Sequence, residues 1–231
     1  MTDEGMEPEA APSAPSQEPE AAPAATHPVP WEDAGLNRFQ GLGRTLGQVL
    51  FHPGDFFRTM PREGWAEALA FALIVGTAGM LACLYWQLLL YLGLSRAVGV
   101  MRAMPCLFSR VEWALIPMML LTPVVMLANL IVSSLGLWGA VGLTGGPWSV
   151  FSPVWRITCY AQGAMVAGFL PLLGGPVAGL WTLVLYYRGL QKVLGLSSWR
   201  ALGVLCLSLV LQVLLVVLLL GSLWGFRLLL G

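Results

Sequence analysis

The side chains that most often do chemistry in proteins are few in this sequence, and they are scattered. Its four cysteines form no CxxC pair, which argues against a disulfide framework; they are Cys83, Cys106, Cys159 and Cys206. The two histidines, His27 and His52, have no carboxylate cluster beside them, whereas a metal site needs several converging ligands. The chain also lacks a GxSxG motif, a Walker loop and a GxGxxG motif. We therefore expect no metal, no cofactor and no catalytic residue, and we do not expect an enzyme.

Polar side chains inside the apolar stretches suggest a second kind of chemistry, a path for a solute. No Asp or Glu follows Glu112, whereas proton pumps and coupled transporters typically carry intramembrane Asp, Glu or His. This argues against proton-coupled transport and against an intramembrane protease with paired Asp residues. Gln87, Asn129 and Gln162 are candidates for lining a path for a neutral or anionic solute, although such residues more often form hydrogen bonds between helices.

Composition shows that the elements positioning these residues are membrane helices. Hydrophobic residues make up 57% of the 231 residues, charged residues only 10%, and the mean hydropathy is +0.75. Soluble domains carry about 25% charged residues, so this chain has too little charge to cover a surface that faces water. A soluble monomer, a nucleic-acid-binding protein with a basic face, and a secreted disulfide scaffold are therefore excluded.

The first 33 residues form an acidic head. They contain eight Asp and Glu residues and no Lys or Arg, and seven prolines fall within the first 30 residues. Because such a segment has little to bury, we predict that residues 1–33 form a disordered tail. This tail is either a docking site for a soluble protein partner or only a solvated leader.

Residues 34–64 have the pattern of an amphipathic segment. Apolar residues recur at helical spacing from Leu36 to Leu50, with arginines and glutamines largely between them. Pro53 and Gly54 then interrupt the pattern before a short second apolar element. We predict that this segment lies at the membrane surface and contacts lipid; packing against the protein's own helices is the alternative.

The remaining residues, 65–231, contain four charge-free intervals. The interval 157–187 would be about 47 Å long as one helix, too long for a bilayer core of about 30 Å, and Pro171 to Pro176 form a turn signal within it. The fold class is therefore an all-α polytopic membrane protein, a bundle of five transmembrane helices. A re-entrant hairpin over 157–187, with three full spans, is the alternative. The predicted spans are approximately 68–94, 113–139, 155–172, 175–193 and 201–223.

Five spans place the two termini on opposite sides of the membrane. With the N-terminus in the cytoplasm, eight of the twelve basic residues face the cytoplasm and four face the outside, as the positive-inside rule favours. The predominance of Arg, Ala, Gly, Leu and Pro suggests a GC-rich bacterial genome, and hence a bacterial cytoplasmic (inner) membrane. Small residues such as Ala68, Ala72 and Gly76 recur every fourth position, a spacing that allows close helix packing within one bundle or in a homo-oligomer.

Two groups of residues carry a resemblance to a known family. One is Pro30-Trp31-Glu32 followed by the Pro-x-x-Phe-Phe element, and the other extends from Trp155 to Leu202. In this order and spacing they resemble the Yip-domain membrane proteins, in particular the bacterial type, over about residues 30–220. The residues at the matching positions are Pro30, Trp31, Glu32, Pro53, Phe56, Phe57, Arg156, Tyr160, Pro171, Gly179, Gly189 and Arg200.

The resemblance implies a five-span helical fold with a cytosolic N-terminus. Eukaryotic members of this family are adaptors in vesicle trafficking that bind Ypt/Rab GTPases and one another, and a bacterial member need not share those partners. We therefore expect a non-enzymatic membrane adaptor or organiser that binds proteins or lipid, and no nucleic-acid partner. The alternative is a small permease or channel lined by Gln87, Asn129 and Gln162.

Overall fold

The structure, a computed structural model, describes residues 29–33, 35–97 and 117–230, and every regular element in these ranges is helical. The predicted all-α fold is thus confirmed for the described part of the chain. Most of the predicted disordered tail, residues 1–28, lies outside the described residues, as does the beginning of the second predicted span, 113–116.

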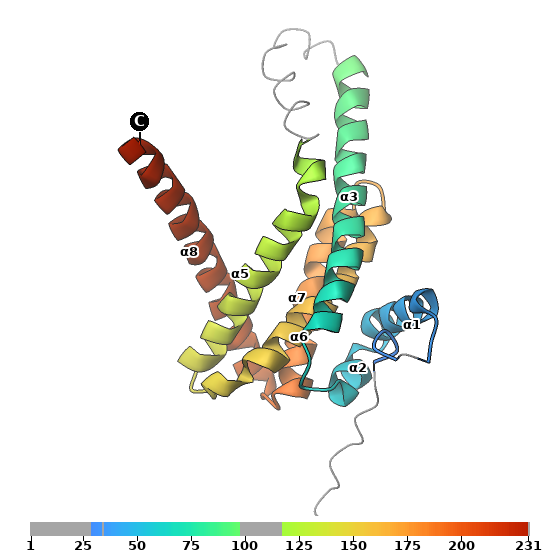
Figure 1. The fold of residues 1–231 in the computed structure, drawn as a ribbon, viewed down its shortest axis with the longest axis vertical. Helices are drawn as coiled ribbons and strands as arrows, with labels where there is room; N and C mark the ends of the chain where they lie inside the picture. The colour runs from blue at the N-terminus through green and yellow to red at the C-terminus, as the bar shows by residue number, and fades with distance from the viewer. Residues whose placement is uncertain (1–28, 34, 98–116, 231) are drawn as a thin grey trace, which may run out of the picture.

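The long helical segments of the described chain run alternately up and down the molecule (Figure 1). The upward segments are α3 (Ala66–Ala97), α6 (Phe151–Ala161) continued by the 3₁₀ helix η3 (Gln162–Phe169), and α8 (Ser198–Leu230). The downward segments are α5 (Thr122–Leu143), which a short 3₁₀ turn η2 (Trp148–Val150) joins to α6, and α7 (Gly174–Val193). Two shorter helices, α1 (Arg38–Phe51) and α2 (Pro53–Thr59), lie at the end of the molecule where α3 begins.

Three of the described helices are long and apolar enough to cross a membrane: α3 over Ala66–Leu90, α5 over Thr122–Leu143 and α8 over Ser198–Leu219. They match the first, second and fifth predicted spans. The other two predicted spans correspond to a helical hairpin made of α6, η3 and α7, so the structure supports three spans by length and composition and does not confirm five.

Two helix boundaries differ from the prediction, because glycine and proline were interpreted as helix-ending residues where the helix in fact continues. The second predicted span ends at residue 139, but α5 continues to Leu143. Gly142 stays helical and leaves room for the Trp148 ring, and the chain turns only at Gly145, whose φ is +83°. α6 begins at Phe151, before the predicted start at 155, because Pro153 is tolerated in the first turn of a helix.

The hairpin packs against α3 through direct backbone contact. A Cβ on Gly79 of α3 would collide with the backbone of Met165, and a Cβ on Gly168 of η3 would collide with the carbonyl oxygen of Gly79. Ala68 and Ala72 lie fully buried in the first two turns of α3. The predicted stripe of small residues therefore does bring helices together, and it continues beyond Gly76 to Gly79.

Helix α8 is the least buried of the three candidate spans, with 17% of its apolar window inside the protein. It contacts α5 where Gly136 allows a close approach, since a Cβ there would lie 3.2 Å from the carbonyl oxygen of Ser208. Most of its remaining surface is exposed Leu and Val, the composition of a helix that faces lipid.

Helix α1 uses one face to pack on the protein. Gly41, Thr45 and Val49 are buried, and the Val49 side chain lies against Gly163 of η3. This face therefore packs against the protein's own helices, which was the alternative considered for the amphipathic segment. The Phe39 side chain, by contrast, is 84% exposed, so a second apolar part of α1 remains available to another surface.

Candidate functional site

A cluster of polar contacts lies where residues 29–33 meet the beginning of α3 and the second half of α6. Arg156 of α6 is the largest side chain that is fully buried, with 1% of its surface exposed. Its Nη2 donates a hydrogen bond of 2.6 Å to Oε1 of Glu32, whose side chain is 15% exposed. The pair therefore joins residues 29–33 to α6 through a charge-assisted contact that is largely buried.

The loop before α3 is shaped around the same guanidinium group. Nη1 of Arg156 donates to the carbonyl oxygens of Glu63 and Gly64, each at 2.8 Å. Gly64 has a φ of +89°, which favours glycine, and a Cβ at this position would lie 3.1 Å from Nη1. Arg156 thus fixes the entry to α3 as well as residues 29–33.

Tyr160 completes the cluster one helical turn after Arg156. Its hydroxyl donates a hydrogen bond to the same Glu32 oxygen, and its ring centroid lies 5.5 Å from the Arg156 guanidinium carbon. The rings of Phe56 from α2 and Phe71 from α3 both contact Tyr160, with centroids 5.1 Å away. We call Glu32, Arg156 and Tyr160 the N-terminal lock.

Trp31, the residue before Glu32 of the lock, is held in place by two hydrogen bonds. Its backbone N–H donates to Oγ1 of Thr45 at 3.0 Å, and its indole Nε1 donates to the carbonyl oxygen of Glu67 at 2.8 Å. Its ring contacts Phe71, and the carbonyl of Pro30 lies so close to Gly41 that a Cβ there would approach it to 2.6 Å. Residues 29–33 are thus part of the packed domain, which begins earlier than the predicted boundary after residue 33, because Trp31 and Glu32 find buried partners.

The lock brings together residues that the sequence analysis named separately. Glu32, Arg156 and Tyr160 form it, while Trp31 and Phe56 border it. Three further candidates occupy structural positions: Phe57 is buried in α2, Pro53 is the first residue of α2, and a Cβ on Gly189 would lie 2.6 Å from Ile157.

The last three family positions lie elsewhere. Pro171 is in the turn between η3 and α7, and a Cβ added to Gly179 would meet no atom within 4 Å. Arg200 is exposed in the first turn of α8, where its Nη2 lies 3.4 Å from the carbonyl oxygen of Thr144.

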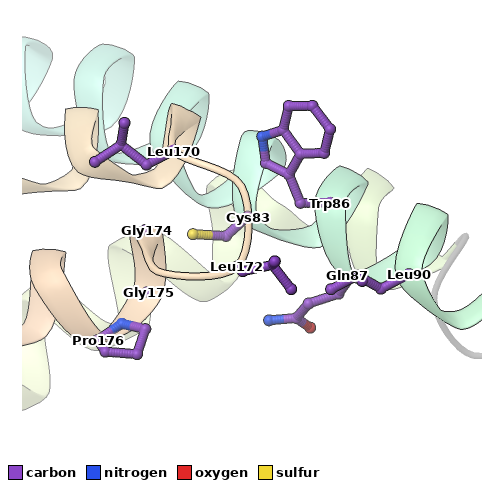
Figure 2. Close-up of a pocket in the computed structure, with 9 residues that line it drawn as sticks. All are labelled: Cys83, Trp86, Gln87, Leu90, Leu170, Leu172, Gly174, Gly175 and Pro176. Atoms are coloured by element: carbon purple, nitrogen blue, oxygen red, sulfur yellow. The ribbon is translucent and has the colours of Figure 1, made fainter.

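The three polar candidates for a solute path lie in three different environments. Gln87 is exposed and lines a cavity of about 80 Å³ between α3 and the hairpin turn, where Figure 2 shows it together with Cys83 and Leu172. Asn129 is exposed on α5, and Gln162 is buried in η3 with no hydrogen-bond partner for its Oε1. The three candidates therefore do not share one environment in the described part of the chain.

Sequence analysis did not single out Gly64, Phe71 or Thr45. Gly64 carries a signal that could have been used, since a glycine directly before a long apolar helix often marks a special backbone conformation. Phe71 and Thr45 look like any other residue of a helix, and only their contacts with Trp31 give them a role.

The lock holds its charges against each other rather than toward a ligand. The carboxylate of Glu32 and the guanidinium of Arg156 neutralise one another, and the aromatic rings around Tyr160 exclude water. Such an arrangement is suited to holding two segments in a fixed position, because breaking it would leave a buried charge unpaired.

Comparison with known proteins gives the family. A family model for the Yip1 domain matches residues 47–220, about three quarters of the chain. Neither the curated proteins nor the solved structures that were searched contain a match to this chain. The matched range runs from within α1 to the apolar part of α8 and includes Arg156 and Tyr160, while Glu32 precedes it. Together with three apolar helices of membrane-spanning length, this confirms the resemblance seen in the sequence: the chain belongs to the Yip1 domain family and is an integral membrane protein.

Proposed function

We propose that the protein is a non-enzymatic membrane adaptor or organiser that presents residues 29–60 as a platform on one side of the membrane. The observation that carries this proposal is the N-terminal lock, which ties the platform to a membrane helix through a buried ion pair of 2.6 Å. A segment needed only to lead the chain into the membrane would not require such a contact. A partner that binds the platform is therefore held in a fixed position relative to the helices.

Exposed aromatic side chains support contact between the platform end and the lipid headgroup region. Phe39 and Phe51 of α1 are 84% and 78% exposed. Trp65, directly before α3, is 65% exposed, and Trp199, the second residue of α8, is 84% exposed. Trp residues near the ends of membrane helices typically sit at the interface between membrane and water. The exposed part of α1 is thus positioned to touch lipid while its buried face packs on the protein.

We further propose that the α6–η3–α7 hairpin crosses the membrane as two short spans, which gives five spans in all. Arg156 binds the carbonyl of Gly64 at one end of the hairpin, and Trp86 Nε1 donates to the carbonyl of Phe169 at the other. From Gly64 to Trp86 is 22 residues, or about 33 Å of helix, close to the thickness of the bilayer core. The 3₁₀ geometry of η3 supports this length, because it rises about 2.0 Å per residue.

The charge distribution favours the cytoplasm for the platform. Eight basic residues belong to the platform end of the described helices and loops; they are Arg38, Arg44, Arg58, Arg62, Arg156, Arg188, Lys192 and Arg200. By the positive-inside rule, this end faces the cytoplasm, here proposed to be that of a bacterial cell with the protein in the inner membrane.

The acidic head is the part of the chain best suited to recruit a soluble protein. Residues 1–28 contain six acidic residues and no Lys or Arg, and they join the platform directly before the buried Val29. A basic surface on a soluble protein is the complementary partner.

Affinity capture from native membranes in lipid nanodiscs tests the proposal. Full-length protein is compared with a deletion of residues 1–28 and with a variant in which the six acids of that segment are replaced by Gln or Asn. The deletion must end before Val29, because removing Glu32 would also leave Arg156 without its counter-charge. A stoichiometric partner lost in both variants supports an adaptor. Absence of any partner from all three samples would contradict it.

A further inference from the structure

Residues of α5 and α8 line a groove, and these two helices lie on the side of the molecule away from α1 (Figure 1). The two helices touch near Gly136 and diverge toward the C-terminal end of α8. The groove has a volume of about 260 Å³ and is lined entirely by Leu, Gly and Trp. Its lining includes Gly139 and Leu143 of α5, Trp148, and Leu211, Leu214 and Leu218 of α8.

A cation lies in line with this groove. Arg200, Leu207, Leu211, Leu214 and Leu218 are spaced by 7, 4, 3 and 4 residues, so they share one face of α8. The Arg200 side chain is exposed, and its Nη2 lies 3.4 Å from the carbonyl oxygen of Thr144, the residue after Leu143 of the groove. Because guanidinium has five donors, one long contact to a carbonyl leaves most of its capacity for an anion.

Aromatic residues place this end of the groove at the membrane surface. Trp148 lines the groove, and its carbonyl accepts a hydrogen bond of 2.9 Å from Trp138 Nε1. The rings of Trp148 and Phe151 lie 5.0 and 5.8 Å from the Trp138 ring. Clustered Trp residues at a helix end are typical of the headgroup region, so Arg200 is at the depth where lipid phosphates lie.

We infer that the groove binds one acyl chain of an anionic phospholipid whose phosphate pairs with Arg200. Charge complementarity favours this occupant over a second copy of the protein. No Asp or Glu follows Glu112, so the helices α5 to α8 of a second copy have no carboxylate to pair with Arg200. A phospholipid supplies both the chain that fills the apolar groove and the anion. This site is separate from the platform and goes beyond the adaptor proposal.

Native mass spectrometry of the full-length protein tests the inference. The protein is taken from nanodiscs of phosphatidylcholine containing one-fifth phosphatidylglycerol, and the lipids that remain bound are counted. Arg200→Gln removes the headgroup contact, and Arg62→Gln is its control on an exposed arginine at the same end of the molecule. Gly139→Leu fills the groove, and Gly93→Leu is its control, since Gly93 of α3 has no atom within 4 Å of an added Cβ.

The two test variants have different expected results. Arg200→Gln should lower the preference for phosphatidylglycerol over phosphatidylcholine about fivefold, the effect of one surface cation on an anionic lipid. Gly139→Leu should remove the retained lipid whatever its headgroup, while both controls keep it. Unchanged lipid retention in both test variants would overturn the inference. Loss of a dimer in Gly139→Leu, with no retained lipid in the unmodified protein, would show that a second copy fills the groove instead.

Discussion

A single carboxylate oxygen of Glu32 accepts hydrogen bonds from two residues of α6, Arg156 and Tyr160. Replacing Glu32 with Gln keeps the shape of this side chain but leaves the buried guanidinium of Arg156 without a counter-charge. We expect the free energy of unfolding to fall by about 3 kcal/mol, as for other broken buried ion pairs. Thermal unfolding of the purified protein in detergent measures this change.

A second ion pair of the same molecule provides the control for Glu32→Gln. Arg38 and Glu67 lie 3.3 Å apart, but their side chains are 67% and 50% exposed. Glu67→Gln should therefore change the free energy of unfolding by less than about 1 kcal/mol. Equal effects of the two substitutions would contradict a structural role for the lock. In addition, Tyr160→Phe should cost less in the Glu32→Gln background than in the unmodified protein, because the two residues share one hydrogen bond.

Gly64 gives a second test of the lock at the level of one residue. Gly64→Ala places a methyl group 3.1 Å from Arg156 Nη1 at a φ of +89°. Gly195 also has a positive φ, +65°, but no atom lies within 4 Å of an added Cβ. Both substitutions should cost about 1–2 kcal/mol of backbone strain. Gly64→Ala should cost about 1 kcal/mol more because it displaces a hydrogen bond of Arg156, and equal unfolding free energies would contradict this contact.

Sequence reasoning could name the members of the lock but not their contact. The resemblance singled out Glu32 and Arg156, which are 124 positions apart. Nothing in a single sequence pairs an acid in a proline-rich head with an arginine in the middle of a later helix. The pairing depends on α1 packing against η3 through Val49 and Gly163, a fit of surfaces that spacing does not encode.

At the scale of the elements, the α6–η3–α7 hairpin was also predicted only in part from the sequence. The turn between its arms was predicted from Pro171 and Pro176, and α7 begins one residue before the predicted start at 175. The 3₁₀ conformation of Gln162–Phe169 was not predicted, because eight residues of this geometry are uncommon and need support from outside. Here the support comes from Gly79 of α3, against which Gly168 packs.

The two interpretations of this hairpin predict different exposure of its turn. A single cysteine at Gly175, where an added Cβ meets no atom within 4 Å, is introduced after the four native cysteines are replaced. If both arms cross the membrane, a membrane-impermeant maleimide should label this cysteine only from the side opposite the platform. Gly43→Cys on α1, which is equally open, should be labelled only from the platform side. Labelling of both positions from the platform side would show a re-entrant hairpin.

For the whole molecule, the basic residues are distributed unevenly between its two ends. Eight basic residues lie at the platform end, whereas Arg96 and Arg227 belong to the final turns of α3 and α8 at the opposite end. The other two basic residues, Arg102 and Arg110, lie outside the described residues. The sequence alone predicts an uneven distribution of this kind, because the alternation of charge-free intervals with arginines is a property of the chain. The lock adds to the excess of basic residues at the platform end, because it holds Arg156 there.

This distribution predicts on which side each terminus lies. Alkaline phosphatase, which is active only outside the cytoplasm, should be active when fused after Gly231, whereas a fluorescent protein that folds in the cytoplasm should stay dark there. Fusion after Val193 should reverse both signals, because it removes α8 and leaves the reporter at the end of a helix that returns to the platform side. The physical reason for this expectation is the positive-inside rule, by which the end with the excess of Lys and Arg stays in the cytoplasm. Active phosphatase at Val193 together with inactive phosphatase at Gly231 would show that the platform faces outward.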